Sequence, residues 1–557
     1  MTGAVMTKTG ATSTLSSADA ASIKSRCNAG GVVCFGTGTI PSALRNLPTY
    51  SLASIKIPLD DVARGRGIPC GKSQGIKEVG MSKLSLWKTI CLVCVFCAVA
   101  AIGSPAQTFT LLHSFNGTDG SAPYAVVQGT NGNFYGAASG GGAYANGTVF
   151  KITHGGTLTT LHSFCAQAGC PDGSAPNGLV LATDGNFYGT TASGASTSCT
   201  GLSGCGTVFK ITHGGTLTTL HSFNGNDGAE PAATLVEATD ANLYGATNYG
   251  GANCAPYGCG TVFKITPSGK LTTLHSFDGT DGSNPWGVVQ ATDGNFYGTT
   301  SLGGANGQGT VFKIAQTGTL TTVYSFCSQT GCTDGSYASE GLVQATDGNF
   351  YGTTWFGGAN NDGTVFKITA RGTLTTLHSF NGTDGFTPRG GVVQGADGNF
   401  YGSVDNGHPS NDGAVFKITA TGRLTTLHSF RGTDGRFPFA APVQATDGNF
   451  YGTTAGGGTS SNCPFVGCGT VFSLSVGLSP FIETLPTSGK VGTAVTILGN
   501  NLTDSTGVAF NGTAATFKVI SSTEIKTKVP DGATTGFVKV TRPKRTLKSN
   551  VAFRVKK

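Results

Sequence analysis

Hydrophobic and polar residues alternate in short runs from about residue 107 onward. One repeat of the pattern contains four such runs, typified by GVVQAT, NFYGTT, GTVFKI and LTTLHSF, separated by Gly, Asp and Asn. Runs of this length that are rich in Val, Thr, Tyr and Phe predict β-strands. Asp-Gly between the first two runs is typical of a two-residue hairpin, because both turn residues must accept positive φ. The pattern therefore predicts four antiparallel strands per repeat, which we call a, b, c and d.

Three landmarks of this pattern recur seven times each. The Tyr-Gly step of strand b recurs every 50 to 56 residues, at Tyr135, Tyr188, Tyr244, Tyr297, Tyr351, Tyr401 and Tyr451. The GTVF or GAVF run of strand c ends at Phe150, Phe209, Phe263, Phe312, Phe366, Phe416 and Phe472. The LHSF or VYSF run of strand d ends at Phe115, Phe164, Phe223, Phe277, Phe326, Phe380 and Phe430. Four antiparallel strands in a repeat of about 50 residues are typical of a propeller blade.

The two ends of the repeat array are incomplete in a complementary way. The array begins with a lone d strand at 109–115 and ends with strands a, b and c at Ser475. Pairing of the first strand with the last three would complete both ends and leave no open edge. We therefore predict an all-β fold in which residues 107–475 form a closed seven-bladed β-propeller.

The motifs NFYGTT, GTVFKIT and LTTLHSF resemble the GloVer-type tandem repeat of secreted bacterial proteins over roughly residues 108–475. This resemblance implies a secreted, often surface-anchored repeat protein and brings no known activity with it. The glycines after strand b are also similar to those of kelch repeats, although the Trp of the fourth kelch strand is absent.

The pattern changes after Ser479. Several short alternating runs predict an immunoglobulin-like β-sandwich over residues 479–557. The runs at 486–499, 508–512 and 529–530 resemble the P-x-S-G-x-x-G-x-x-V-x-I-x-G, V-x-F-N-G and V-P elements of an IPT/TIG domain. This second resemblance implies a spacer or a binding module.

Residues 81–106 have the pattern of a secretory signal peptide, with Lys83 and Lys88 near the start, an apolar run from Ile90 to Ile102, and small residues up to Ala106. The apolar run is shorter than the about 20 residues that a membrane-spanning helix needs, so we expect no transmembrane segment in the mature chain. Residues 1–80 are then explained by an incorrectly placed start codon or by a disordered extension. We expect the protein to be secreted or held at the cell surface.

Composition narrows the choice of partners. Glycine contributes 88 of 557 residues, and charged residues only 11%, which suits many tight turns and short strands. The net charge of +7 is small for this length and forms no basic stripe, so we expect no nucleic-acid partner. We expect a monomer without a cofactor.

Ten cysteines follow the predicted signal peptide, and they occur only as close neighbours. Repeats that lack one member of a pair also lack the other. In an exported protein this predicts five local disulfides, since a zinc site would need four convergent ligands. The pairs are Cys165 with Cys170, Cys199 with Cys205, Cys254 with Cys259, Cys327 with Cys332, and Cys463 with Cys468.

All five cysteine pairs fall in d-to-a or b-to-c loops, which antiparallel order places on one face. The same loops vary in length, and the variable face of a repeat scaffold is usually the binding face. Residues just before strand a and just after strand b also differ between repeats. The candidates for ligand binding are Tyr124, Tyr249, Trp286, Glu340, Trp355, Phe356, Arg389 and Phe439. Aromatic and polar side chains on a rigid face suit sugar stacking or a protein partner, although packing between blades is an alternative.

Glu237 is a further candidate. It is the only charged residue at a strand a position that otherwise carries mostly glutamine, and a ring of these side chains could line the central channel.

Recurring polar residues indicate structure rather than catalysis. The histidines of LHSF appear in six repeats, at His113, His162, His221, His275, His378 and His428. A side chain repeated around the whole array is explained by packing or hydrogen bonding, and the recurring Asp-Gly aspartates are turn formers. The multi-carboxylate spacing of a dedicated calcium loop is missing, so we expect no metal site, and calcium at the NGTDG loops is the alternative. After residue 106 there is no G-x-S-x-G, H-E-x-x-H or phosphate-loop motif.

Three functions remain open from the sequence. We favour a binding or adhesion protein that engages carbohydrate or a surface partner through the variable face. The first alternative is a glycan-active hydrolase or lyase that uses carboxylates such as Glu237, Glu340, Asp405 and Glu230. The second is a structural envelope protein without a discrete ligand.

Overall fold

The computed structural model describes residues 107–195, 198–199, 202–231, 233–407, 410–463 and 466–556. The chain divides into two units, Met1–Ala100 and Ala101–Lys557, and every described residue belongs to the second. The predicted leader at 1–80 and signal peptide at 81–106 lie outside the described residues. The described part is built from β-strands and contains no α-helix beyond two short 3₁₀ turns, η2 (Thr330–Cys332) and η3 (Leu502–Asp504). None of its helices is long and apolar enough to cross a membrane.

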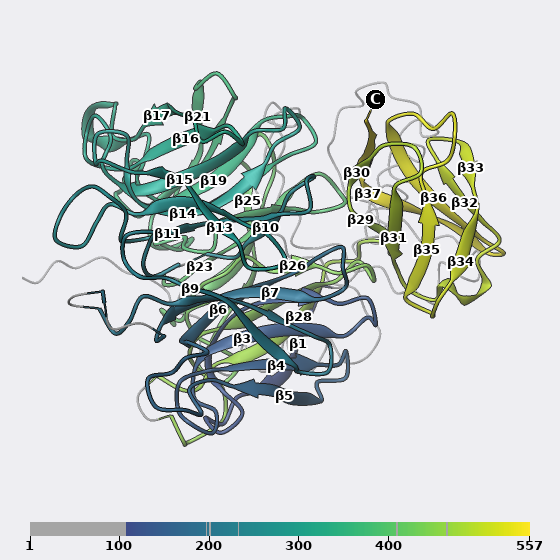
Figure 1. Ribbon diagram of the computed structural model, residues 1–557, viewed down its shortest axis with the longest axis horizontal. Helices are drawn as coiled ribbons and strands as arrows, with labels where there is room; N and C mark the ends of the chain where they lie inside the picture. The colour runs from purple at the N-terminus through teal and green to yellow at the C-terminus, as the bar shows by residue number, and fades with distance from the viewer. Residues whose placement is uncertain are drawn as a thin grey trace, which may run out of the picture. The chain divides into compact units, whose positions relative to one another are not determined.

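Described residues between 108 and 475 form seven four-stranded antiparallel sheets (Figure 1), which we number in chain order. Sheet 1 contains β2 (Ser121–Gln128), β3 (Phe134–Gly140), β4 (Thr148–Ile152) and β5 (Leu158–Ser163). Sheet 2 contains β6 (Ser174–Leu181), β7 (Phe187–Ser193), β8 (Thr207–Ile211) and β9 (Leu217–Ser222). Sheet 3 contains β10 (Val236–Glu237), β11 (Leu243–Thr247), β12 (Thr261–Ile265) and β13 (Leu271–Ser276). Sheet 4 contains β14 (Ser283–Gln290), β15 (Phe296–Leu302), β16 (Thr310–Ile314) and β17 (Leu320–Ser325).

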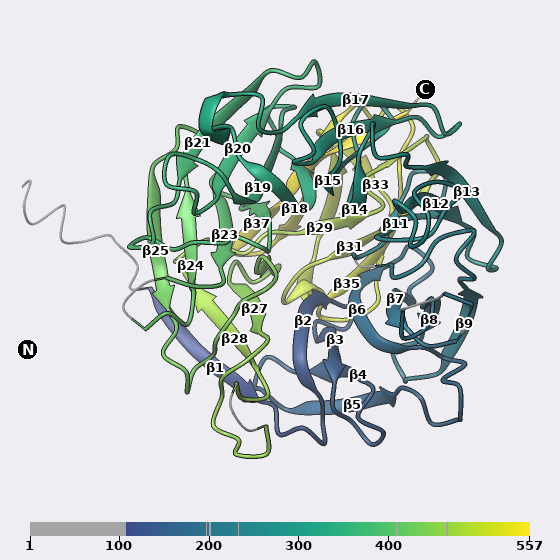
Figure 2. The same cartoon turned by 90° about the vertical axis from the view of Figure 1, so that its left-hand side faces the viewer.

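The remaining three sheets follow the same order. Sheet 5 contains β18 (Ser336–Gln344), β19 (Phe350–Phe356), β20 (Thr364–Ile368) and β21 (Leu374–Ser379). Sheet 6 contains β22 (Val392–Gln394), β23 (Phe400–Val404), β24 (Ala414–Ile418) and β25 (Leu424–Ser429). Sheet 7 contains β26 (Val443–Gln444), β27 (Phe450–Thr454), β28 (Thr470–Ser475) and β1 (Thr108–Ser114). In Figure 2 the first strands of the sheets lie toward the middle of the array and the fourth strands at its periphery.

Sheet 7 combines the two ends of the array. Strand β1 pairs antiparallel with β28, with Phe109 opposite Leu474 and Leu111 opposite Phe472. The N-terminal strand therefore occupies the fourth place in the last sheet, as the incomplete ends of the array predict.

Successive sheets are held together by the aromatic pair of strand b. At six of the seven junctions the Tyr ring of one sheet contacts the Phe ring of the next, as with Tyr135 on Phe187, where the ring centroids are 4.2 Å apart. Between sheets 2 and 3, Leu243 takes the place of the Phe, and Tyr188 and Leu243 share a buried cluster. The same contact joins sheet 7 to sheet 1, between Tyr451 and Phe134 at 3.9 Å. Both faces of strand b are covered by neighbouring sheets, so its residues are buried without a polar side. Each repeat therefore stabilises the next one.

A glycine after the Tyr makes room for a third aromatic ring. A Cβ atom on Gly136 would lie 2.6 Å from the Phe150 ring and 2.7 Å from the Ala125 carbonyl oxygen. Because both contacts are far below van der Waals distance, no larger residue fits here without moving strand c or strand a. This close approach explains why Tyr-Gly, rather than Tyr alone, marks the repeat.

All five predicted disulfides are present. They join Cys165 to Cys170, Cys199 to Cys205, Cys254 to Cys259, Cys327 to Cys332, and Cys463 to Cys468. Two lie between a fourth strand and the next first strand, and three between a second and a third strand. The variable loops on this side of the sheets are therefore covalently braced.

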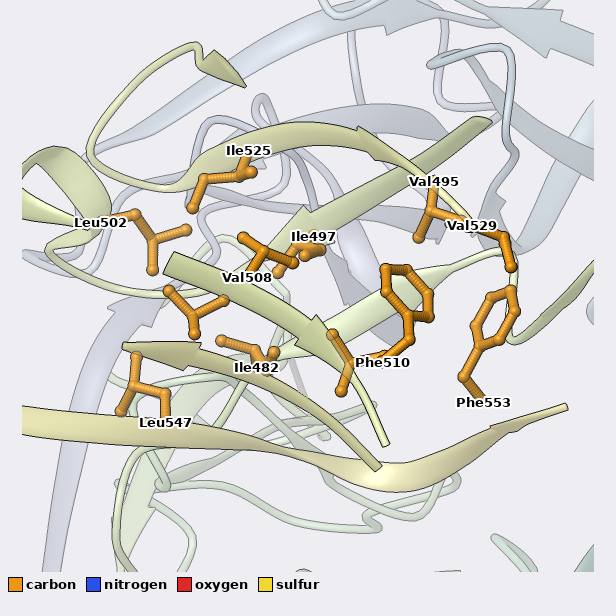
Figure 3. Close-up of a cluster of buried hydrophobic side chains, with 12 residues drawn as sticks. Ile482, Val495, Ile497, Leu502, Val508, Phe510, Ile525, Val529, Leu547 and Phe553 are labelled. Atoms are coloured by element: carbon orange, nitrogen blue, oxygen red, sulfur yellow. The ribbon is translucent and has the colours of Figure 1, made fainter. Parts of the chain in front are cut away.

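The C-terminal domain consists of two sheets. One contains β29 (Glu483–Leu485), β31 (Ala494–Leu498), β35 (Glu524–Lys528) and β34 (Phe517–Val519). The other contains β30 (Ser488–Gly489), β37 (Arg545–Val555), β36 (Gly536–Arg542), β32 (Gly507–Phe510) and β33 (Thr513–Ala515). Figure 3 shows side chains such as Ile497, Ile525, Phe510 and Phe553 gathered in one core, and all four are at most 1% exposed.

Candidate functional site

The start of the first strand is irregular in several sheets. In sheets 1, 2 and 4 the pairing of the first strand with the second changes register within the first strand. In sheet 1 this shift lies between Pro123 and Val126. In sheet 5 the shift lies between Ser339 and Val343. Extra residues in a strand redirect side chains out of the normal alternation, and such bulges are common beside functional sites. Tyr124 and Glu340 lie within these irregular segments.

Seven side chains from six sheets surround one pocket of about 180 Å³. We call it the aromatic pocket. Its lining residues are Tyr124, Asn177, Trp286, Glu340, Trp355, Arg389 and Phe439. Six of these seven residues are among the candidates that the sequence singles out. The candidates therefore converge although they are spread over more than 300 residues of sequence.

The Tyr124 hydroxyl donates a hydrogen bond to Glu340 Oε1. These residues belong to sheets 1 and 5, which are not neighbours in the array. The contact therefore links first strands across the array and forms one wall of the pocket. Glu340 itself has a φ of 44°, in the left-handed region that is unfavourable for a non-glycine residue.

Arg389 is the positively charged residue in the lining of the aromatic pocket and forms an ion pair with Asp405. Its Nε lies 2.8 Å from Asp405 Oδ2, and the Asp405 side chain is only 3% exposed. The guanidinium carbon lies 4.7 Å from the Trp355 ring and 4.8 Å from the Phe439 ring. These distances are in the range of cation–π attraction. Arg389 is therefore fixed between rings of sheets 5 and 7 and paired with a carboxyl group from its own sheet.

The two tryptophans lie side by side in the pocket. The ring centroids of Trp286 and Trp355 are 5.9 Å apart, with the planes inclined by 59°. Their indole nitrogens are buried and have no hydrogen-bond partner among the described residues. Asn177 is held in place by its side-chain amide, which donates to the Pro231 carbonyl oxygen at 2.6 Å.

The ionisable groups of the pocket have shifted pKa values. Burial raises the pKa of Glu340 to about 7, and the hydrogen bond from Tyr124 offsets part of that shift. Burial also raises the pKa of Asp405 to about 8, against the effect of Arg389 and together with the effect of Glu340. Burial and the neighbouring Glu340 carboxylate raise the pKa of the Tyr124 hydroxyl well above its usual range. Two carboxyl groups therefore titrate near neutral pH at one place.

Two predicted residues lie elsewhere on the variable loops. Tyr249 pairs through its backbone with Ala229 and packs on the buried cluster of sheets 2 and 3. Phe356 is 38% exposed and makes an edge contact with Tyr337, with the centroids 5.6 Å apart. Neither residue lines the aromatic pocket.

Glu237 also lies apart from the pocket and joins two sheets. Its carboxylate accepts hydrogen bonds from the Thr183 backbone nitrogen at 2.8 Å and from the Thr183 hydroxyl at 2.6 Å. The glutamines at this position make the equivalent bond, in which Oε1 accepts from a backbone nitrogen of the preceding sheet. They are Gln128, Gln290, Gln344, Gln394 and Gln444. These six side chains therefore hold adjacent sheets together, and a polar ring around a central channel stays a prediction.

The recurring histidines bond to the recurring loop aspartates. His113 Nε2 lies 2.9 Å from Asp119 Oδ2, and the other oxygen of Asp119 accepts from the Asn116 backbone nitrogen at 2.8 Å. Tyr324, which replaces His in one repeat, donates to Asp334 at 2.7 Å. These contacts support the structural interpretation of both residues. Within the described residues, no group of three or more His, Cys, Asp and Glu side chains is placed to hold a metal ion.

Two residues of the site are absent from the ligand-binding candidates chosen on sequence. Asn177 stands at the repeat position of Tyr124, but its small polar side chain gave no reason to select it. Asp405 stands at the repeat position of Trp355 and was named only as a carboxylate of the hydrolase or lyase alternative. The burial of Asp405 under Arg389 is visible only in the structure.

Comparison with known families covers most of the chain. The family described as the Gloeobacter/Verrucomicrobia repeat matches residues 98–255 and 252–472, and the IPT/TIG domain matches residues 480–555. Both agree with the resemblances that the sequence motifs indicate. No curated protein matches the chain.

Solved structures with a similar arrangement are distant. A gluconolactonase from Xanthomonas campestris is 12% identical, with a TM-score of 0.31, covering 58% of this chain and 90% of its own. An auxiliary nutrient binding protein from Bacteroides thetaiotaomicron is 13% identical, with a TM-score of 0.35, covering 66% and 76%. A protein of unknown function from Dyadobacter fermentans is 10% identical, with a TM-score of 0.37, covering 66% and 98%. Nothing about the activity of this chain follows from likenesses of this size.

Proposed function

Because the chain belongs to the Gloeobacter/Verrucomicrobia repeat family and ends in an IPT/TIG domain, we propose that it is a secreted or cell-surface protein that binds carbohydrate in the aromatic pocket. The repeat and the TIG domain suggest a surface-associated protein. Five disulfides support export, because such bonds persist in oxidising compartments. The signal peptide proposed at 81–106 would direct that export.

The observation that carries the proposal is the convergence of four aromatic rings with a carboxylate, a guanidinium and an amide. A sugar presents apolar faces of C–H groups and a rim of hydroxyls, so it needs rings for stacking and polar groups for orientation. The pocket is smaller than the about 300–1,000 Å³ of typical ligand sites. It therefore suits one sugar ring, such as the end of a glycan chain.

The rigidity of the site supports the same proposal. We infer that the seven sheets form a closed seven-bladed propeller, in which β1 completes the last blade. This inference is supported by the β1 pairing with β28 and by the Tyr451 contact with Phe134. A closed ring would hold six sheets in register around the pocket and would preorganise it for a ligand.

The test uses residues 107–557 on an array of bacterial and plant glycans, followed by titration of the best ligand. We expect Trp286→Ala and Trp355→Ala each to weaken binding at least about tenfold, because each removes one stacking ring. Tyr144→Ala is the matched control. Tyr144 is an aromatic residue of the loop between β3 and β4, it is 49% exposed, and it does not line the pocket. Retained folding of all three variants is checked by circular dichroism.

Lack of binding to every glycan and to cell-wall fractions would argue against the proposal and favour a structural envelope protein. Equal losses in the Tyr144 variant and in the tryptophan variants would place the binding surface outside the pocket.

A glycan-active hydrolase or lyase is the second candidate. Raised carboxyl pKa values in a pocket are typical of catalytic acids and bases, and Glu340 and Asp405 both have them. If this candidate is right, the protein releases reducing ends or unsaturated products from a glycan that it binds. Glu340→Gln should then abolish that release while the glycan still binds. Release that survives in this variant would exclude Glu340 as the catalytic group.

A further inference from the structure

The charges of the aromatic pocket are not balanced. Asp405 and Arg389 form a close pair, with Nε and Oδ2 2.8 Å apart, so together they carry no net charge when both are ionised. Within the described part of the chain, no Lys, Arg or His forms such a pair with Glu340. Among the described residues only the neutral Tyr124 hydroxyl donates to its side chain, and it does so to Oε1. When both carboxyl groups are ionised, Glu340 is therefore the carboxylate of the pocket that has no cationic partner among the described residues.

Like the Glu340 carboxylate, the aromatic rings of the pocket favour a positively charged ligand. The face of an aromatic ring is electronegative and attracts cations, most strongly for Trp. The site already shows this preference, because the Arg389 guanidinium lies over both Trp355 and Phe439. Trp286 and Tyr124 line the pocket as well, and among the described residues no Lys or Arg lies over their rings. A cationic ligand in the pocket would meet the Trp286 ring together with a carboxylate.

We propose that the aromatic pocket selects a sugar ring that carries a protonated amino group, with Glu340 as its charge partner. This inference rests on the proposed carbohydrate binding and names the class of sugar. The sugar ring stacks on tryptophan, and its ammonium group reaches the Glu340 carboxylate. The titration of Glu340 near neutral pH fits this role, since an ammonium ion beside it favours the ionised form.

An acidic sugar fits the pocket less well. Arg389 is the single cation among the described lining residues, and Asp405, 2.8 Å from it, balances its charge when that carboxyl group is ionised. A sugar carboxylate would also approach Glu340 and the electronegative ring faces, both of which repel an anion. A neutral sugar would leave the Glu340 charge unpaired in a partly desolvated site.

The test compares glucosamine, N-acetylglucosamine, glucose and glucuronate by calorimetric titration of residues 107–557 at neutral pH. We expect glucosamine to bind about tenfold or more tightly than the two neutral sugars, since an ion pair and a cation–π contact are added. Glu340→Gln is the key variant, because its amide oxygen still accepts from Tyr124 while the charge is removed. We expect this variant to bind glucosamine and glucose with nearly equal affinity.

The outcomes separate this inference from the proposed function. Binding of glucose and N-acetylglucosamine without preference for glucosamine would overturn amine selectivity and leave carbohydrate binding intact. Preference for glucuronate that Arg389→Gln removes would overturn it in favour of an anion site. A glucosamine preference that persists in Glu340→Gln would overturn the role of Glu340. If no sugar binds while the protein is folded, both proposals are wrong.

Discussion

At the scale of single residues, Glu340 combines three unusual properties. It is half-buried in an aromatic site, it has a backbone φ of 44°, and the Tyr124 hydroxyl is its one side-chain partner among the described residues. Strained backbone of this kind costs of order 1–3 kcal/mol and persists only where the surrounding structure enforces it. The neighbouring first strand runs close beside it, since a Cβ atom added to Gly341 would lie 3.4 Å from the Gly287 carbonyl oxygen.

The raised pKa of Glu340 has a consequence for stability. The unfolded chain ionises this group at about pH 4.3, whereas the folded chain holds the proton until about pH 7. Folding is therefore favoured below the unfolded value, and this contribution is lost as the pH rises through the folded value. The titratable and charged groups around Glu340 are Tyr124, Asp405 and Arg389. The pKa of Asp405 is raised as well, so its contribution to stability changes with pH in the same direction.

We expect Glu340→Gln to flatten the fall in unfolding free energy between about pH 4.3 and about pH 7, by up to about 3 kcal/mol. Denaturant titrations of wild type and variant at several pH values measure this. Parallel pH profiles for the two proteins would contradict the shifted pKa.

At the scale of elements, sheets such as 4 and 5 are joined twice. The stacked rings of Tyr297 and Phe350 connect their second strands, and a glutamine side chain at the end of the first strand of sheet 5 bonds to the turn of sheet 4. Gln344 makes such a bond, accepting from the Thr292 backbone nitrogen at 2.8 Å and donating to the Gly348 carbonyl oxygen at 3.2 Å. Leu181 occupies the same repeat position in sheet 2, so the site tolerates a leucine of similar size.

We expect Gln344→Leu to lower the unfolding free energy by about 1–2 kcal/mol, because hydrogen bonds between sheets 4 and 5 are lost without a steric clash. The midpoint of denaturant unfolding reports the change. Gln167→Leu is the control, since Gln167 is exposed in a loop and should cost less than about 0.5 kcal/mol. Equal effects of the two substitutions would show that the bond between the sheets contributes nothing.

At the scale of the whole array, the proposed closure depends on one strand pair. Thr110 of β1 lies opposite Ser473 of β28, and directly opposed residues of antiparallel strands have Cα atoms within disulfide range. A bond at this place would connect the two ends of the repeat region and would close a very long loop.

We expect the double substitution Thr110→Cys and Ser473→Cys to form a disulfide and to raise the unfolding free energy by about 2–5 kcal/mol. Mass spectrometry after alkylation detects the bond, and denaturant unfolding with and without reductant measures its effect. The control pairs Thr110→Cys with Ser475→Cys, whose partner in the register is Thr108 instead. Free thiols in the correctly paired variant would show that β1 does not complete the last sheet.

The sequence alone determined the features that repeat. Period-two alternation and Asp-Gly turns predict the strands, and the incomplete ends predict the pairing of β1 with β28. The five disulfides were predictable because each joins cysteines 5 or 6 residues apart. Both domain families are recognisable from short motifs. In the repeat, close packing of the Phe ring against the glycine of the Tyr-Gly step allows little variation of the motif.

Only the tertiary structure decided which variable residues meet. Repeat position predicts the face of a sheet, but Glu237 lies at the end of its strand and joins sheets, whereas Glu340 lies in a bulge and lines the pocket. Tyr124 contacts Glu340 from a sheet that is not its neighbour, and Asp405 is buried by Arg389. Bulges and contacts between distant sheets leave no periodic signal in the sequence. They depend on the three-dimensional positions of strands from several repeats, which the pattern of one repeat does not contain.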